Sequence, residues 1–141
     1  MENRAINMHE NWIKLDVPKS EKSEFIVTSV IHDLKGTKIT LDDEKNVVEL
    51  FWNGQTPILR SSDEGIRLRT SGEVQRKYND KTFFRNCYLY RVENSKLLDW
   101  AVEESCGLYE KEKLNHYCVV TSVYLVDVIA GFEPEIVVKP L

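Results

Sequence analysis

Short runs of β-branched and aromatic residues, separated by turn residues, recur along this chain and predict antiparallel β-structure. Three such runs follow one another at residues 25–31, 37–41 and 47–52. Gly36 marks the turn between the first two, and an acidic cluster at residues 42–46 marks the next turn. We therefore expect the three runs to form a β-meander, because short turns join antiparallel neighbours.

The dipeptide Asn53-Gly54 comes directly after the third run and is a strong hairpin signal, because both residues tolerate positive φ. It predicts that residues 56–60 pair back onto that run, with Pro57 confining them to a sheet edge or a bulge. Residues 61–80 are mostly polar, so we expect only a turn and a short strand in this part of the chain.

The second half of the chain predicts further strands. Residues 82–92 alternate, with aromatic side chains on both sides, which is typical of a central strand. Strands are also expected at 116–121, 123–130 and 136–138. A helix is the alternative for 123–130, but its many β-branched residues favour a strand.

One helix is expected, at residues 96–106. Asn94 or Ser95 is suited to cap its N-terminus, and Gly107 is suited to end it. Together these elements predict the α+β class, with a mainly antiparallel β-sheet (meander) and one amphipathic helix packed on it. At ~3.6 residues per turn, the apolar stripe of the helix consists of Leu97, Leu98, Ala101, Val102, Ser105 and Cys106.

The 141 residues contain no repeat and no linker, which predicts one domain spanning 1–141. The N-terminus lacks the apolar core of a secretory signal, and no apolar run reaches the ~20 residues that span a bilayer. Cys87, Cys106 and Cys118 are odd in number and form no Cys-x-x-Cys pair, which indicates reduced thiols. We therefore expect a cytoplasmic protein that does not contact a membrane.

We find no motif for catalysis, a cofactor or a metal: the chain has no Gly-rich phosphate loop, no Gly-x-Ser-x-Gly and no His-Glu-x-x-His. His116 and Cys118 would lie ~7 Å apart along a strand, too far for a hydrogen-bonded catalytic pair. The 23 acidic residues against 19 basic ones argue against direct nucleic-acid binding and favour a positively charged protein partner. We expect no enzymatic activity.

The outer face of the expected helix is the best candidate for a binding surface. Trp100 lies among acidic residues there, and aromatic side chains are over-represented as interface hot spots. The alternative is that Trp100 packs against a neighbouring loop. Glu133 and Glu135 are possible extensions of this face. The candidate partner-binding residues are Asp99, Trp100, Glu103, Glu104, Glu110 and Glu112.

A second possible site is a groove beside the expected hairpin. Trp52, Arg60 and the turn at residues 61–65 would form its edge. The alternative, which we favour, places Trp52 in the core and leaves Arg60 exposed.

The C-terminal half, over roughly residues 80–137, resembles the small immunity proteins of bacterial polymorphic-toxin systems. Among these it is most similar to the partners of wall-associated toxins of Gram-positive bacilli. The resemblance implies a non-enzymatic cytosolic protein that binds one cognate toxin domain, many of which are nucleases with basic active surfaces. The segments that carry it are the strand at 83–92, Glu-Asn-Ser-Lys-Leu-Leu-Asp-Trp at 93–100, Glu-Ser-Cys-Gly-Leu-Tyr at 104–109, His-Tyr at 116–117, Asp-Val-Ile-Ala at 127–130 and Phe-Glu-Pro-Glu at 132–135.

Two other classes of function stay open at this point. One is a small β-rich domain that binds a small ligand in a groove lined by Tyr88, Tyr90, Tyr117 and Tyr124. The other is a structural or assembly subunit, which stable homo-oligomers would indicate.

Overall fold

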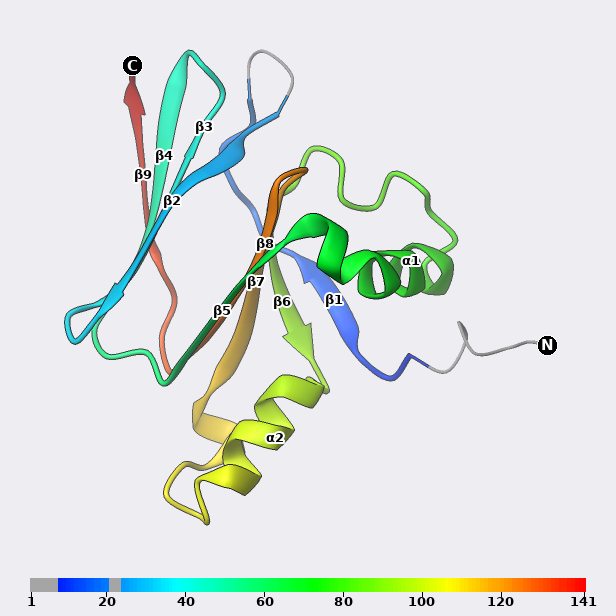
Figure 1. The fold of residues 1–141 in the computed structure, drawn as a ribbon, viewed down its shortest axis with the longest axis vertical. Coiled ribbons are helices and arrows are strands. Elements are labelled where there is room, and N and C mark those ends of the chain that lie inside the picture. Colours follow the sequence, from blue (N-terminus) through cyan, green and yellow to red (C-terminus); the bar gives the residue numbers. More distant parts are fainter. Residues whose placement is uncertain (1–7, 21–23) are drawn as a thin grey trace.

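The computed structural model describes residues 8–20 and 24–141. In this part of the chain, nine strands form two antiparallel sheets (Figure 1). Residues 1–7, which bear on the expected lack of a secretory signal, lie outside the described ranges. The smaller sheet has the order β2-β3-β4-β9, with β2 at Ile26–Asp33, β3 at Gly36–Asp42, β4 at Asn46–Asn53 and β9 at Glu135–Pro140.

The larger sheet has five strands in the order β1-β6-β7-β8-β5, and every neighbouring pair is antiparallel. Its strands are β1 at Asn11–Lys14, β6 at Leu89–Glu93, β7 at Asn115–Val120, β8 at Tyr124–Ala130 and β5 at Ile58–Asp63. The helical elements are the 3-10 helix η2 at Glu64–Arg67, α1 at Leu68–Lys77, α2 at Lys96–Glu104 and the 3-10 helix η3 at Lys111–Lys113.

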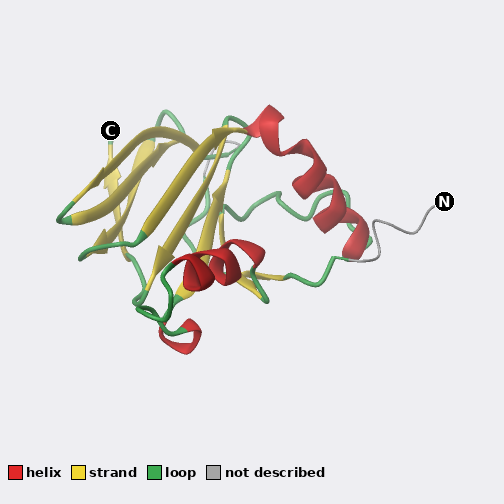
Figure 2. Cartoon of the chain, turned by 60° about the horizontal axis from the view of Figure 1, so that its bottom comes forward, coloured by secondary structure: helices red, strands yellow, loops and turns green. Residues whose placement is uncertain are grey.

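The five-stranded sheet is covered on both faces. On one face it packs against the smaller sheet, where the rings of Trp52 in β4 and Tyr117 in β7 lie 5.5 Å apart. The opposite face carries His116 and Asp127 and contacts the starts of the two helices, which both lie away from the smaller sheet (Figure 2). Strands that are buried on both faces have mostly apolar sequences without alternation, and β7 and β8 are of this kind.

Several predictions of the fold are confirmed. The class is α+β and mainly antiparallel, and β2, β3 and β4 form the expected meander. The strands expected in the last quarter of the chain correspond to β7, β8 and β9, so the helical alternative for 123–130 is wrong. The expected helix forms as α2, and Ser95 caps it, since its Oγ accepts a hydrogen bond from the Leu98 amide at 3.0 Å.

The hairpin predicted at Asn53-Gly54 is wrong. The Gly54 amide donates to the Lys35 carbonyl at 2.9 Å, which holds the chain beside the β2–β3 turn instead of reversing it. The chain then crosses to the other sheet, where β5 pairs with β8. In that register Arg60 lies opposite Asp127, so a buried carboxylate gains a cationic partner that pairing with β4 would not give it.

The structure also contains a second helix, α1, in the region expected to hold a turn and a short strand. Leu68 and Val74 are the large apolar residues among its ten, and Gly72 disfavours a helix, so the segment has the composition of a polar loop. The strand expected over 82–92 is limited to β6, because residues 81–86 form turns that end at Asn86 with φ 66°. Asparagine tolerates this left-handed conformation better than most residues do.

The three cysteines are free thiols, and Cys87 and Cys118 are buried as expected. Cys106 is exposed, although it was expected to end the apolar stripe of the helix. The reason is that α2 ends at Glu104 and Cys106 adopts a φ of 52°, which turns its side chain off the helical face.

Candidate functional site

We call the candidate site the α2–η3 surface. It is formed by one continuous segment that runs along α2, through a turn and into η3. Its residues are Asp99, Trp100, Glu103, Glu104, Leu108, Tyr109, Glu110 and Glu112, and all eight are exposed.

Helix α2 presents this surface because its contact with the sheet is narrow. Leu98 is the one buried residue of the helix. Trp100 follows two positions later, about 200° around the helix axis, and so points away from the sheet. The exposed fraction of Trp100 is 55%, which is high for the largest apolar side chain. The alternative in which Trp100 packs against a neighbouring loop does not fit this exposure.

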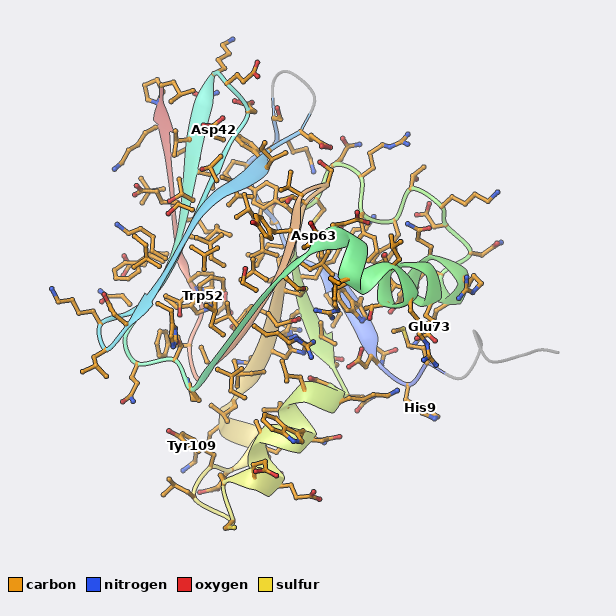
Figure 3. All side chains as sticks on the ribbon, viewed as in Figure 1. His9, Asp42, Trp52, Asp63, Glu73 and Tyr109 are labelled. Carbon is orange, nitrogen blue, oxygen red and sulfur yellow. The ribbon has the colours of Figure 1, made fainter. Side chains whose placement is uncertain are left out.

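The turn after α2 adds two more apolar side chains to the surface. Positive φ values at Cys106 (52°) and Gly107 (88°) reverse the chain. The Ser105 hydroxyl holds the turn, because it donates to the Val102 carbonyl at 2.7 Å and accepts from the Tyr109 amide at 3.2 Å. Leu108 is 79% exposed and Tyr109, to the left of α2 in Figure 3, is 38% exposed.

The charge of the surface is negative and only partly compensated. Segment 96–113 contains five acidic residues and three lysines, so its formal net charge is −2. Lys111 pairs with Asp99 at 2.7 Å, and Lys113 pairs with Glu110 at 3.4 Å. Within the described part of the chain, the remaining acids, Glu103, Glu104 and Glu112, have no cationic partner. These three carboxylates are available to a basic ligand.

The structure thus places all six sequence-predicted residues at the surface of one continuous segment. Two of them, Asp99 and Glu110, are engaged in ion pairs within that segment. At the second possible site the favoured alternative is confirmed, because Trp52 is fully buried in the core and Arg60 is exposed. A pocket of about 470 Å³ opens nearby, lined by Gln55, Thr56, Pro57, Tyr109 and the β2–β3 turn, and Trp52 does not line it. Arg60 binds Asp127 instead of lining a groove.

A buried polar network lies beneath α2, and sequence reasoning missed it. Asp127 in β8 has no exposed surface, and its Oδ1 accepts from His116 Nε2 at 2.8 Å. Its Oδ2 accepts from Arg60 Nε at 2.8 Å and from Arg67 Nη1 at 2.7 Å. The Nδ1 of His116 is hydrogen-bonded to Ser95 Oγ at 2.6 Å, which links the cap of α2 to the sheet.

The network keeps Asp127 ionised. Burial alone raises the pKa of Asp127, but the hydrogen bond and charge of His116 and the charges of Arg67 and Arg60 outweigh it. The net result is a pKa below the usual range for aspartate. Cys118 lies directly opposite Asp127 in the sheet, and burial, followed by this negative charge, raises the pKa of its thiol.

The order Ser95–His116–Asp127 is that of a nucleophilic triad, but the geometry gives it another role. Ser95 is 1% exposed and His116 is 2% exposed, so a substrate does not reach the hydroxyl in this structure. The Ser95 oxygen also caps α2. The network therefore fixes the position of α2. The sequence signal was present: an acidic residue inside the apolar run Tyr-Leu-Val-Asp-Val-Ile-Ala must find partners when it is buried.

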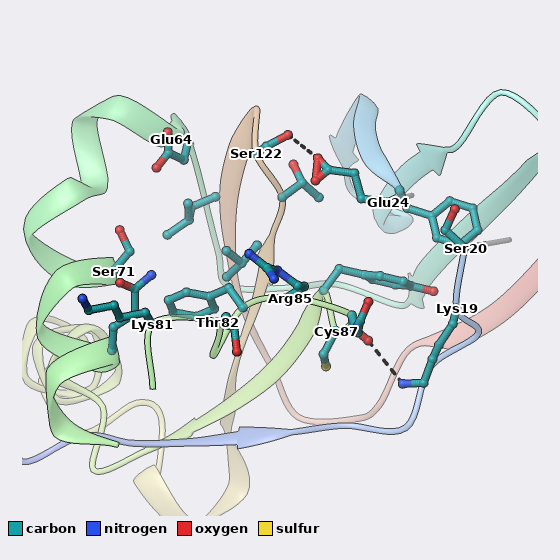
Figure 4. Close-up of a pocket in the computed structure, with 18 residues that line it drawn as sticks. Lys19, Ser20, Glu24, Glu64, Ser71, Lys81, Thr82, Arg85, Cys87 and Ser122 are labelled. Carbon is teal, nitrogen blue, oxygen red and sulfur yellow. Dashed lines mark hydrogen bonds between the residues drawn. The ribbon is translucent and has the colours of Figure 1, made fainter. Parts of the chain in front are cut away.

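A pocket of about 500 Å³ opens at the other end of the larger sheet (Figure 4). Cationic side chains of Lys19, Lys81 and Arg85 and the acidic side chains of Glu24 and Glu64 line it, so it has no single sign of charge. Its walls come from residues 19–20 and 24–25, from α1, from the segment 81–88 and from the β7–β8 turn.

Of the four tyrosines expected to line a groove, only Tyr88 lines this pocket. Its hydroxyl donates to the Pro18 carbonyl at 2.8 Å, and burial raises its pKa. Tyr90 and Tyr117 lie in the core instead, and Tyr124 is 40% exposed outside the pocket lining.

No helix among the described residues is long and apolar enough to cross a membrane. In this same part of the chain, no three His, Cys, Asp or Glu side chains are grouped as metal ligands. In comparisons of sequence and of structure, no protein-family model, curated protein or solved structure matches this chain. The assignment of function therefore depends on the chemistry of its own residues.

Proposed function

We propose that this protein is an immunity (antitoxin-type) protein that binds a cognate bacterial toxin domain and covers its active surface. The α2–η3 surface makes the contact, and the partner is a basic domain, a nuclease in the simplest case. The observation that carries the proposal is that Trp100, Leu108 and Tyr109 are exposed beside three carboxylates without cationic partners. The resemblance of residues 80–137 to immunity proteins supports the same function.

The apolar part of the surface supplies the affinity in this proposal. Exposed Trp and Tyr side chains are the residue types that dominate binding free energy when a partner desolvates them. Single scattered apolar residues are normal on a protein surface, but here three lie within ten positions of the chain. Their burial by a partner would stabilise the complex and lengthen its lifetime.

The acidic part of the surface supplies selectivity and speed of association. A nuclease active surface is positive because it binds phosphates, so the carboxylates of Glu103, Glu104 and Glu112 complement it. Charge complementarity of this kind raises the association rate and disfavours acidic partners. It makes the interaction sensitive to salt.

The buried network makes α2 a rigid platform for this contact. Ser95 and His116 hold the start of the helix against β7. A surface that is already ordered loses less conformational entropy on binding than a flexible one does.

The first experiment captures the partner and then tests the surface. The tagged protein is purified from its native cells, and the protein that remains bound in equal amount is identified and produced separately. Titration calorimetry should show that Trp100→Ala weakens this complex at least about 30-fold, equivalent to about 2 kcal/mol. Ile66→Ala is the matched control, because Ile66 is 76% exposed in η2 and lies outside the α2–η3 surface.

The activity of the partner completes the test. We expect the isolated partner to arrest growth when it is produced in cells, and co-production of this protein to restore growth. The Trp100→Ala variant should protect less well than Ile66→Ala does. Equal affinity and equal protection by the two variants would show that the α2–η3 surface is not the binding site.

The pocket favours a second candidate function, the binding of a small ligand. Its cations and carboxylates face one cavity, which suits a zwitterionic or mixed-charge molecule. Thermal unfolding in the presence of amino acids and nucleotides tests it. Stabilisation that disappears in Arg85→Gln would support this function, and the lack of any stabilising ligand would argue against it.

A further inference from the structure

The outer edge of the smaller sheet is unprotected. β9 pairs with β4 on one side and, within the described residues, has no strand on the other (Figure 1). All six of its residues are exposed, including Ile136 at 36%, Val137 at 43% and Val138 at 45%. Natural proteins usually shield an apolar edge strand of this kind, because its free amides and carbonyls are a template for another strand.

The backbone of β9 defines which groups face outward. The Leu141 amide donates to the Lys45 carbonyl at 3.0 Å, so it points toward β4. Since the direction alternates along a strand, Lys139, Val137 and Glu135 also bond toward β4. The amides and carbonyls of Ile136 and Val138 therefore face the free edge. Pro140 falls on the same outward side, where its missing N–H costs the sheet nothing.

We propose that β9 is a dimerisation edge at which two copies of this chain pair antiparallel about Val137. The two smaller sheets then become one continuous eight-stranded sheet. This interaction is separate from the α2–η3 surface, which lies on other elements.

The sequence of β9 is complementary to itself in this register. Ile136 lies opposite Val138 of the second copy, and each of these two equivalent pairs exchanges two backbone hydrogen bonds. Glu135 lies opposite Lys139 of the second copy, again twice, so opposite charges meet across the axis. Opposite-charge cross-strand pairs are favourable, whereas like charges opposite each other are unfavourable.

Neighbouring registers differ in their charge pairing. A twofold axis at Ile136 places Glu135 opposite Val137 of the second copy, and an axis at Val138 places Lys139 opposite Val137. Neither register pairs Glu135 with Lys139, so this opposite-charge contact is specific to the axis at Val137. Pro134 lies opposite Pro140 of the second copy in that register, so the backbone pairing ends at the two Ile136–Val138 pairs.

The exposed apolar residues of β9 also become buried in the dimer. Ile136 and Val138 pair with Leu50 and Val48 of β4, which are fully buried on the inner face of the sheet. Ile136 and Val138 lie on the same inner face, but at its outer edge, where the larger sheet does not cover them. This position explains their exposure. In the dimer the same residues of the second copy lie beside them.

The test uses two charge variants of the whole chain. Glu135→Lys gives a strand with lysine at both 135 and 139. Lys139→Glu gives a strand with glutamate at both positions. Each variant alone should dimerise at least about tenfold more weakly than the wild type, because like charges lie opposite each other. Mixed in equal amounts, they should form a heterodimer, since both cross-strand pairs are then of opposite charge.

Sedimentation velocity from about 5 to about 500 µM measures these equilibria. Circular dichroism and binding of the captured partner confirm that the variants are folded. A wild type that stays monomeric over this range would overturn the proposal. So would single variants that dimerise as tightly as the wild type, or a mixture of the two that does not associate.

Discussion

Helix α2 separates two polar regions that differ in how their charges are compensated. At its start, Ser95, His116 and Asp127 are at most 2% exposed and are joined by hydrogen bonds of 2.6 and 2.8 Å. On its outer face, Glu103 and Glu104 are exposed and have no cationic partner among the described residues.

The comparison distinguishes polar residues that stabilise the fold from polar residues that are available to bind a partner. A buried carboxylate that is paired on both oxygens has no capacity left for a ligand, and its role is to define the fold. An exposed carboxylate contributes little to stability but remains free to meet a partner. We therefore expect mutations in the buried network to change stability and mutations on the outer face to change binding.

The largest expected effect is that of Asp127→Asn. The substitution removes the negative charge and leaves Arg67, whose side chain is 13% exposed, without its ionic partner. We expect a loss of about 3–5 kcal/mol in the free energy of unfolding, measured with urea. Glu103→Gln is the matched control and should stay within about 0.5 kcal/mol of the wild type. Similar stability of the two variants would contradict the role assigned to the network.

Acid should remove the same contribution from the wild-type protein. The pKa of Asp127 is lowered in the folded state, so its stabilising contribution is fully present above the unfolded pKa of about 4. It is lost as the pH falls below that value toward the folded pKa. The wild type should therefore lose stability below about pH 4 more steeply than Asp127→Asn does.

An intermediate effect is expected for Ser95→Ala. This change removes the cap of α2 and the hydrogen-bonding partner of His116 Nδ1, at a cost of about 1–2 kcal/mol. The rate of amide hydrogen exchange should increase most at the start of α2. Ser122→Ala provides the comparison, because the exposed Ser122 hydroxyl bonds to Glu24 in a turn and should contribute far less. Unchanged exchange in α2 would contradict the proposed link between cap and sheet.

The smallest expected effect is that of the double change Glu103→Gln and Glu104→Gln on the outer face. Stability should not change, but the association rate with the captured partner should fall several-fold at low salt. The difference from the wild type should shrink as salt rises, because screening removes the advantage of the charges. Stopped-flow measurements at two salt concentrations test this, and a salt-independent difference would argue against electrostatic steering.

The sequence predicted those parts of the molecule that depend on local signals. The turns at Gly36 and at residues 42–46 determine the β2–β3–β4 meander, and Ser95 determines the start of α2. Gly36 illustrates how strict such a signal is, since a Cβ there would lie 2.0 Å from the Trp52 carbonyl oxygen. All six candidate site residues are at the surface, and five of them are acidic, which disfavours burial without a partner.

The features that were missed depend on contacts between distant residues. The pairing of β5 with β8 brings Arg60 to Asp127, 67 positions apart, and no local pattern encodes that contact. Helix α1 was missed for a different reason: it buries only Val74 and contains Gly72, so its polar composition concealed a helix. The buried network joins five elements, namely β5, η2, α2, β7 and β8, and only the acid within the apolar run of β8 indicates it in advance.

Hydrogen exchange of the protein alone and in its complex with the captured partner tests the central claim most directly. The account predicts slower exchange on binding in α2 and η3, over residues 99–113, with no change in η2 around Ile66. Protection confined to other elements, such as the pocket walls or β9, with residues 99–113 unaffected, would contradict it.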